Sequence, residues 1–237
     1  MWGTEVSTPQ IREAGEGLTQ ANASSETTIH RNPRDLTFRR CSSEDLETCC
    51  KLAEDAWPMV RPRETQLFVE SCLLWSDWAE LAYESQEVVG VLICKIVKKD
   101  WLGRAVGTAS RLFAYFMLLV RFILRGPPQE LRFLWNFLLT DGKVARNQPR
   151  ADAEIQTVIV HSSHRGEGIA RALVDRFIIA ARQEAQIRTM RVYTTPPLSD
   201  WRFYERYGFK RMGMFHDNHA SYLTSRDLNG FFYLLTL

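Results

Sequence analysis

VHSSHRGEGIA, residues 160–170, is the strongest signal in this 237-residue sequence. It joins a predicted strand, Ala153–Val160, to a predicted amphipathic helix over 166–186. Its glycines let backbone N–H groups turn toward one point, the helix N-terminus adds positive dipole, and Arg165 adds a formal cation. A pyrophosphate would fit such a turn. The alternative is a glycine-rich turn that binds nothing, because short glycine motifs are weak signals on their own.

The hydrophobic pattern on both sides of this turn predicts an ordered series of strands and helices. Upstream we expect a strand at 36–40, a helix that begins at Ser42 or Ser43 and ends before Pro58, a helix over 64–75, and a hairpin of strands 78–83 and 88–97. Downstream we expect strands at 190–195, 209–215 and 230–236, and a short helix over 201–207 that Gly208 stops. Strands that first form a hairpin and then alternate with helices predict an α/β (α+β) fold with a mixed sheet.

Residues 101–148 differ in composition from their surroundings and are expected to be helical, with one helix over 110–125 and a second over 129–139 that Thr140-Asp141-Gly142 closes. Residues 100–150 contain eight Lys/Arg and three Asp/Glu, so they carry +5 and the rest of the chain carries −3. The apolar run 112–120 is shorter than the ~20 residues that a membrane span needs. Three roles stay open for this segment: a lid over a substrate, a dimer contact, or a basic and apolar surface that touches an anionic membrane.

Composition and cysteine content narrow the class of protein. Hydrophobic residues make up 45% of the chain and the net charge is +2, which suits a globular protein and gives no case for nucleic acid. The five cysteines have no CxxC spacing, so we expect neither disulfides nor a zinc site, and a cytoplasmic location. Residues 1–34 are polar and lack a secretory apolar run, so we expect a disordered tail before one domain, 35–237.

Two motifs resemble one known family. Arg165-x-x-Gly168-x-Ala170, after a strand and opening a helix, resembles the acyl-CoA-binding motif of the GNAT N-acetyltransferase superfamily. Residues 203–209, FYERYGF, resemble the family's later FYEKxGF segment and stand in the same order. The resemblance covers 36–237. It implies a mostly antiparallel central sheet flanked by helices, with 101–148 inserted between the third and fourth strands.

The resemblance also implies an activity. An N-acetyltransferase of this family transfers an acetyl or other acyl group from acyl-CoA to an amine by direct attack, without a metal. The acceptor would be a small-molecule or peptide amine, and the enzyme a monomer or homodimer. The alternative is a non-catalytic acyl-CoA-binding or interaction module. Three positions depart from the family pattern: Ser162 replaces a frequent Pro, Pro196-Pro197 replaces an Asn, and Asp200 replaces a small residue.

The resemblance assigns roles to individual residues. The acyl-CoA would be held by the end of the strand and by the turn, through Val158, Ile159, Val160, Arg165, Gly166, Glu167, Gly168, Ile169 and Ala170. A backbone N–H around Val158 to Val160 would stabilise the carbonyl oxygen. Tyr204 matches the Tyr that protonates the departing CoA thiolate. Its alternative role is that of a buried structural aromatic residue.

A general base is needed because only a neutral amine attacks. Ala153-Glu154-Ile155 resembles the segment that carries the base Glu in the histone-acetyltransferase branch, so Glu154 is the candidate. A strand-end carboxylate facing solvent is the alternative, and Asp152, His161, His164 or water could serve instead. Because side chains alternate between the two faces of a strand, we expect Glu154, Gln156, Val158 and Val160 to lie on the same face. Residues 216–219, HDNH, are expected to form a polar loop without a metal that lines the acceptor site.

Overall fold

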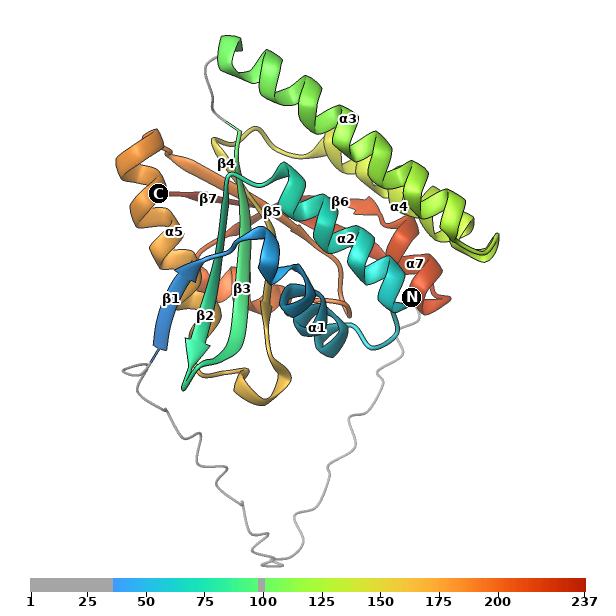
Figure 1. Ribbon diagram of the computed structural model, residues 1–237. Coiled ribbons are helices and arrows are strands. Elements are labelled where there is room, and N and C mark those ends of the chain that lie inside the picture. The colour runs from blue at the N-terminus through green and yellow to red at the C-terminus, as the bar shows by residue number, and fades with distance from the viewer. Residues whose placement is uncertain (1–35, 98–100) are drawn as a thin grey trace, which may run out of the picture. The chain divides into compact units, whose positions relative to one another are not determined.

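The computed structural model describes residues 36–97 and 101–237 (Figure 1). The chain divides into two units, Met1–His30 and Arg31–Leu237, and all described residues lie in the second. The expected tail, 1–34, therefore lies outside the described residues. None of the helices in the described part is long and apolar enough to cross a membrane.

Seven strands form one sheet in the order β1-β2-β3-β4-β5-β7-β6. Only β4 and β5 are parallel neighbours, and every other pair is antiparallel. The predicted mixed, mostly antiparallel sheet is therefore confirmed. The strands are β1 (Leu36–Arg40), β2 (Trp78–Glu84), β3 (Glu87–Ile96), β4 (Ala153–Val160), β5 (Thr189–Thr194), β6 (Lys210–His216) and β7 (Asn229–Thr236).

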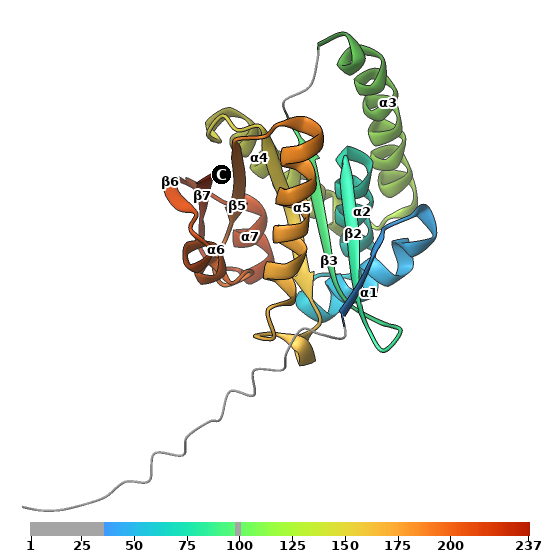
Figure 2. The same cartoon turned by 90° about the vertical axis from the view of Figure 1, so that its left-hand side faces the viewer.

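Helices cover both faces of this sheet (Figures 1 and 2). On one face of the sheet, α5 packs through Leu173, Val174 and Phe177, which form one core layer with the strands. On the other face, Leu52 of α1 and Val69 of α2 belong to a second core layer. The helices are α1 (Leu46–Ala56), α2 (Pro62–Trp75), α3 (Trp101–Arg125), α4 (Gln129–Asn147), α5 (Ile169–Ala185), α6 (Trp201–Tyr207) and α7 (Asn218–Thr224).

A bulge interrupts β4 at Gln156. Ile155 pairs with Cys94 and Thr157 pairs with Ile93, so Gln156 is one residue more than β3 can match. On its other side β4 pairs with β5 only through 153–154. Beyond that point β4 and β5 form no ladder, which leaves a gap between two neighbouring strands in the middle of the sheet.

The bulge corrects the predicted alternation of this strand. Val158 and Val160 pack into the core layer beneath α5, and so does Ile155. Glu154 and Gln156 instead line a cavity beneath α2. An extra residue shifts the side-chain alternation by one, so the four residues predicted to share one face divide between two.

The insertion forms two helices, as predicted, but α4 continues beyond the predicted end at 139 to Asn147. Gly142 therefore lies inside a helix, where it costs roughly 0.5–1 kcal/mol relative to Ala. Tertiary contacts offset this cost: Val144 is buried against Phe215 and Phe232 on β6 and β7. The tendency of Thr140-Asp141-Gly142 to end a helix is therefore overridden by tertiary packing, which the local sequence does not reveal.

The insertion packs on the α2 side of the sheet. Its helices join α2 in a separate apolar cluster built around Leu67, Phe122, Phe133, Leu134 and Phe137. The short helix α7, which the sequence analysis did not predict, touches this cluster through Tyr222 and Leu223. Asp217 caps α7, because its side chain accepts a hydrogen bond from the backbone N–H of Ala220 at 3.0 Å.

Candidate functional site

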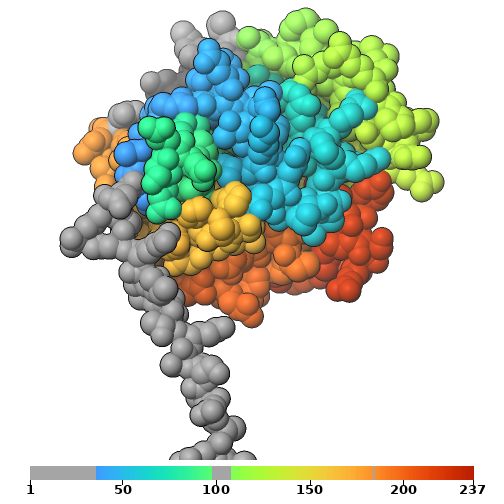
Figure 3. Space-filling model, turned by 60° about the horizontal axis from the view of Figure 1, so that its bottom comes forward, coloured from blue at the N-terminus to red at the C-terminus, as the bar shows by residue number. Residues whose placement is uncertain are grey.

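The turn between β4 and α5 has the geometry of an anion site. Gly166 and Gly168 have φ of 87° and 85°, a left-handed conformation that glycine adopts without steric cost. Gly168 is also the N-cap of α5, so the free N–H groups of the first helical turn begin here. Arg165 is exposed beside them. This turn lies on the surface, bordered by the β2–β3 hairpin and α1 (Figure 3).

Neighbouring elements hold the turn in place. Ser162 donates to the Asp55 carboxylate on α1 through its backbone N–H (2.7 Å) and its hydroxyl (2.8 Å). A Cβ at Gly90 on β3 would lie 3.1 Å from Ile169 Cγ2 and 3.2 Å from the Ile159 carbonyl oxygen. Glycine at this position therefore lets β3 approach the start of α5 closely.

Two predicted alternatives for the base, His161 and His164, lie in this turn. His161 Nδ1 is 2.7 Å from Ser163 Oγ, and His164 Nε2 is 3.0 Å from Glu84 Oε2. Neither side chain lines the cavities described below. Glu84, His164 and Glu167, all half-buried, lie close enough together to hold a metal ion.

The unpaired edge of β4 offers backbone donors to the gap. The His161 N–H donates to the Val89 carbonyl oxygen at 2.9 Å. Because ladder bonds alternate along an antiparallel pair, the Ile159 N–H also turns to β3, and those of Val158 and Val160 turn toward β5. Since β5 does not pair with β4 there, these two N–H groups are available to a bound molecule.

A cavity of about 150 Å³ lies at this gap, and we call it the central cavity. Tyr204 on α6 lines it and is 6% exposed. Burial raises the pKa of the Tyr204 hydroxyl well above its usual range. Three other buried polar atoms of the lining lack a hydrogen-bond partner within the described part of the chain: Thr65 Oγ1, Gln156 Oε1 and His219 Nε2. These unpaired atoms can form hydrogen bonds with a polar ligand in the cavity.

Residues 216–219 reach the central cavity, although they are not a simple loop. Asp217 accepts hydrogen bonds from the hydroxyls of Thr140 (3.0 Å) and Thr195 (2.5 Å). His219 lies in α7, with its ring 4.8 Å from that of Phe133. Burial lowers the pKa of His219 to about 4, so its imidazole is neutral at pH 7. The predicted loop thus contributes a helix N-terminus and a neutral imidazole.

A second cavity, of about 300 Å³, lies between the insertion and the sheet, and we call it the insertion cavity. It shares Phe68, Gln156 and Tyr193 with the central cavity, so the two are adjacent. Its charged lining residues are Lys95, Asp141, Glu154 and Arg191.

Glu154, the predicted base, lines the insertion cavity and does not face open solvent, because its side chain is only 14% exposed. Its Oε2 accepts two hydrogen bonds from Arg191 on β5, at 2.9 and 2.6 Å. Asp152, a predicted alternative for the base, has a structural contact: its Oδ2 accepts hydrogen bonds from the backbone N–H groups of Arg188 and Thr189. That contact joins the starts of β4 and β5.

Asp141 is the site residue that the sequence analysis missed. It lies on α4 and lines the insertion cavity. Burial, together with the negative charges of Glu154 and Asp217, raises the pKa of Asp141 to about 7. A signal was present, since Phe133, Phe137, Asp141 and Val144 follow helical spacing and so share one face. The prediction of a helix end at 140–142 concealed it.

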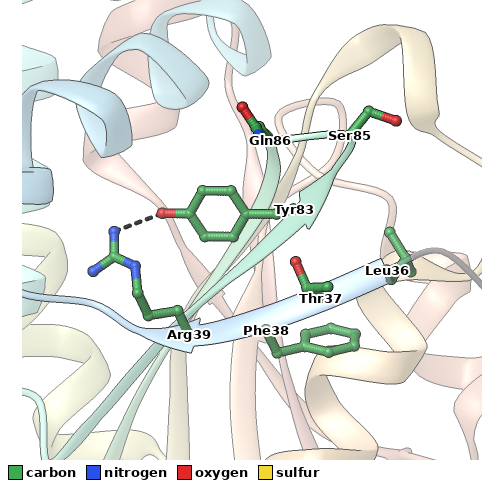
Figure 4. Close-up of a pocket in the computed structure, with 7 residues that line it drawn as sticks. All are labelled: Leu36, Thr37, Phe38, Arg39, Tyr83, Ser85 and Gln86. Carbon is green, nitrogen blue, oxygen red and sulfur yellow. Dashed lines mark hydrogen bonds between the residues drawn. The ribbon is translucent and has the colours of Figure 1, made fainter.

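A further groove, along the edge strand β1 and the β2–β3 turn, contains none of the predicted site residues (Figure 4). Arg39 donates to the Tyr83 hydroxyl there at 2.6 Å and pairs with Asp45. In the sheet order, β1 lies three strands from β4. We therefore assign the candidate site to the β4–β5 gap.

The chain is similar to known proteins in one matched segment and in its fold. The family model described as an acetyltransferase (GNAT) domain matches residues 137–211, which run from α4 into β6 and include the β4–α5 turn and Tyr204. No curated protein sequence matches the chain.

Several solved structures share the fold. The ribosomal-protein-S18-alanine N-acetyltransferase from Escherichia coli is 12% identical, with a TM-score of 0.52 over 85% of this chain and 93% of that one. Ard1 from Thermoplasma volcanium is 15% identical, with a TM-score of 0.51 over 86% and 98%. YncA from Salmonella typhimurium, solved with acetyl-CoA, is 17% identical, with a TM-score of 0.50 over 86% and 94%. The resemblance to the GNAT superfamily is confirmed at the level of the fold and of the matched segment.

Proposed function

We propose that this chain, which has the GNAT fold and a matching acetyltransferase segment, transfers an acetyl or other acyl group from acyl-CoA to an amine. One observation carries the proposal: the glycine turn between β4 and α5 is joined, by a strand edge that β5 does not pair, to a cavity that Tyr204 lines. Acetyl-CoA is the preferred donor, because yncA, a protein of the same fold, was solved with it.

The turn and the strand edge would bind the two ends of the CoA arm. The pyrophosphate would sit on Gly166, Gly168 and the first turn of α5, with Arg165 supplying positive charge. Ile169 and Ala170 open that helical turn, and Glu167 lies within the loop. The pantetheine amides would extend along β4 as a substitute for the missing ladder partner, toward the N–H groups of Val158 and Val160.

The chemistry follows from the groups at the gap. The lone pair of the amine attacks the thioester carbonyl carbon and forms a tetrahedral oxyanion, which a β4 N–H would stabilise. Collapse of this intermediate breaks the C–S bond and releases the CoA thiolate. The Tyr204 hydroxyl carries its proton at neutral pH, as a phenol does at its ordinary pKa or above it, and it can donate that proton to the thiolate. The nitrogen gives its extra proton to a base.

Glu154, the base that the sequence predicts, lines the insertion cavity, where Arg191 holds its carboxylate. The non-catalytic alternative, a module that only binds acyl-CoA, uses the same turn. The buried Tyr204 and the two adjacent cavities favour the enzyme, because binding alone requires neither. A small-molecule or peptide amine as acceptor, a monomer or homodimer, and a cytoplasmic location stay predictions.

The test is release of CoA thiol from acetyl-CoA in the presence of an amine panel. The panel includes arylalkylamines, polyamines, aminoglycosides, amino acids and peptides with free N-termini or lysines. An enzyme releases thiol only with its acceptor, and Arg165→Ala weakens CoA binding measured by calorimetry. Tight CoA binding with no thiol release from any amine would support the binding module instead.

A further inference from the structure

The insertion helix α4 builds part of both cavities. Phe133 lines the central cavity, whereas Phe137, Asp141 and Val144 line the insertion cavity. The sheet contributes Glu154 and β5 residues to the opposite wall. The insertion therefore completes a cavity that adjoins the gap where the thioester would lie.

We propose that the insertion cavity is the acceptor site, and that Asp141 binds the ammonium group of a small, apolar or aromatic amine and takes the proton that it loses. This inference rests on the proposed function. It names the class of acceptor and a catalytic residue outside the two sequence motifs.

The size and lining of the cavity indicate the class of acceptor. Its volume of about 300 Å³ stands at the lower end of the ~300–1,000 Å³ typical of ligand sites, which suits a small molecule. Aromatic rings attract both apolar groups and cations to their faces. Five of them surround this space: Phe68, Trp75, Tyr115, Phe137 and Tyr193.

Two carboxylates line the insertion cavity, and only one of them is paired with another residue that the structure describes. Glu154 is held by Arg191. Asp141 has neither a hydrogen bond nor an ion pair with any residue that the structure describes, so it is the acid that can receive an ammonium group. Gln156 Oε1, in the wall shared by both cavities, also lacks a partner among those residues and can accept a second N–H from the amine. These two acceptors would direct the nitrogen toward the thioester.

The surroundings of Asp141 suit it to proton transfer. The titratable and charged groups around it are Cys72 on α2, Tyr115 on α3, Lys95 on β3, Glu154 on β4, Arg191 and Tyr193 on β5, and Asp217. With a pKa of about 7, Asp141 is partly deprotonated at neutral pH and can accept a proton from an ammonium group.

The test compares Asp141→Asn with Glu154→Gln and with the control Asp227→Asn, which removes an exposed acid. The probe is 2-phenylethylamine with acetyl-CoA. We expect Asp141→Asn to lower kcat/KM at least ~10²-fold, the lower limit for a general base, and to abolish the rise of activity through pH 7. Glu154→Gln lowers activity but keeps that rise, and Asp227→Asn changes neither.

A stability measurement separates this role from misfolding. The folded protein holds the Asp141 proton more tightly than the unfolded chain does, so its free energy of unfolding falls as pH rises from about 4 to about 7. Asp141→Asn lacks this penalty. It should therefore melt at a higher temperature than the wild type at pH 8 and at nearly the same temperature at pH 4, while it loses activity.

The outcomes distinguish the inference from the proposed function. Loss of the pH 7 inflection in Glu154→Gln but not in Asp141→Asn would overturn the inference and make Glu154 the base. Equal turnover of polyamines or lysine peptides by the wild type and Asp141→Asn would overturn it while leaving acyl transfer intact. Calorimetric binding of 2-phenylethylamine that depends on Asp141, without any acetylation, would retain the site and contradict the function.

A different observation concerns the outer face of α3 and α4. Six large apolar side chains of α3 are exposed at spacings that put them on one face: Leu112, Phe113, Phe116, Met117, Ile123 and Leu124. On α4 Leu131, Trp135, Leu138 and Leu139 are exposed in the same way. An exposed apolar surface of this extent marks an interaction site.

The charges on these helices identify the partner. Within 108–147, the stretch of α3–α4 whose side chains the structure describes, the acids are Glu130 and Asp141, and neither is exposed. Glu130 pairs with Arg63, and Asp141 faces the insertion cavity. Arg125, Arg132 and Arg146 are exposed, and so is Arg121, which pairs with Glu70 on α2. We infer that this apolar and cationic face lies on an anionic membrane surface.

Vesicle co-sedimentation tests this second inference. The protein should sediment with vesicles that contain phosphatidylserine, less so in high salt, and remain soluble with phosphatidylcholine alone. Phe113→Ser/Phe116→Ser should abolish sedimentation, whereas Ile179→Ser, an exposed residue of α5, should not. Failure of the wild type to sediment, or a dimer in light scattering that Phe113→Ser/Phe116→Ser dissociates, would overturn it.

Discussion

At the scale of single residues, backbone conformation and burial determine what the site can do. Gly168, in the proposed anion site, has a left-handed φ of 85° and open space where a side chain would project. Tyr204 and Asp141 depend instead on burial, which raises the pKa of both groups. For the phenol this preserves a proton donor, and for the carboxyl group it produces a base near neutral pH.

Replacing Gly168 with Ala should weaken CoA binding. The left-handed conformation costs a non-glycine residue roughly 1–2 kcal/mol, so the turn relaxes and its N–H groups lose their common direction. Calorimetry with CoA measures the effect. Gly142→Ala is the matched control, because it lies in α4 with open space around it and should leave CoA binding unchanged. Unchanged CoA affinity in a folded Gly168→Ala variant would remove the turn from the site.

Replacing Tyr204 with Phe should lower kcat about 10²-fold while CoA affinity is nearly kept, because only the proton donor is lost. Steady-state thiol release measures the rate, and calorimetry measures the affinity. Tyr207→Phe on the same helix is the control, since the Tyr207 hydroxyl bonds Asp175 outside both cavities. Equal rates for Tyr204→Phe and the wild type would exclude Tyr204 from the mechanism.

At the scale of elements, the bulge in β4 lies where β4 and β5 stop pairing, and the proposed acyl transfer takes place in the gap that follows. It shifts the alternation of the strand, and β5 pairs with β4 for two residues only. Gly90 on β3 then allows α5 to begin close to the opened strand. The anion site and the gap are thus consequences of how three elements meet.

Replacing Gly90 with Ala should displace the start of α5. The new methyl group would meet Ile169 and the Ile159 carbonyl at 3.1 and 3.2 Å, and such overpacking costs about 1–3 kcal/mol. We expect lower stability in urea unfolding and weaker CoA binding. Gly213→Ala on β6 is the control, because its nearest neighbour is 3.8 Å away. A Gly90→Ala variant with wild-type stability and affinity would show that the close approach is unimportant.

The elements also show what could be predicted from the sequence. Periodicity and turn residues predicted the β2–β3 hairpin, the strand-turn-helix around Gly168 and the short helix ended by Gly208, because local pattern determines each. The bulge at Gln156 could not be predicted, since it is defined by pairing with β3. Asp141 was missed because a helix end was predicted at 140–142, and the burial that raises its pKa depends on β4 and β5, which only the fold brings to α4.

At the scale of the whole molecule, the insertion joins the acceptor side to the surface. One side of α4 lines the two cavities, and its other side belongs to the exposed apolar face. If that face rests on a membrane, an apolar amine could reach the insertion cavity from the lipid surface. The fold thereby connects the two inferences, although each has its own test.

Deletion of residues 1–34 should leave the fold and CoA binding unchanged. The reason is compositional, because a polar segment with few large apolar residues cannot bury enough surface to order itself. The thermal midpoint and CoA affinity of the truncated and full chains measure this. A large fall in the midpoint would show that the segment packs on the domain.

Direct acyl transfer at the β4–β5 gap can be followed by mass spectrometry of both the amine and the protein. The full chain is incubated with acetyl-CoA alone, and then with 2-phenylethylamine and the rest of the amine panel. We expect one acetylated amine for each CoA thiol released, and no acetyl group on the protein before amine is added. An acetylated protein that later passes its group to the amine, or thiol release without acetylated amine, would contradict it.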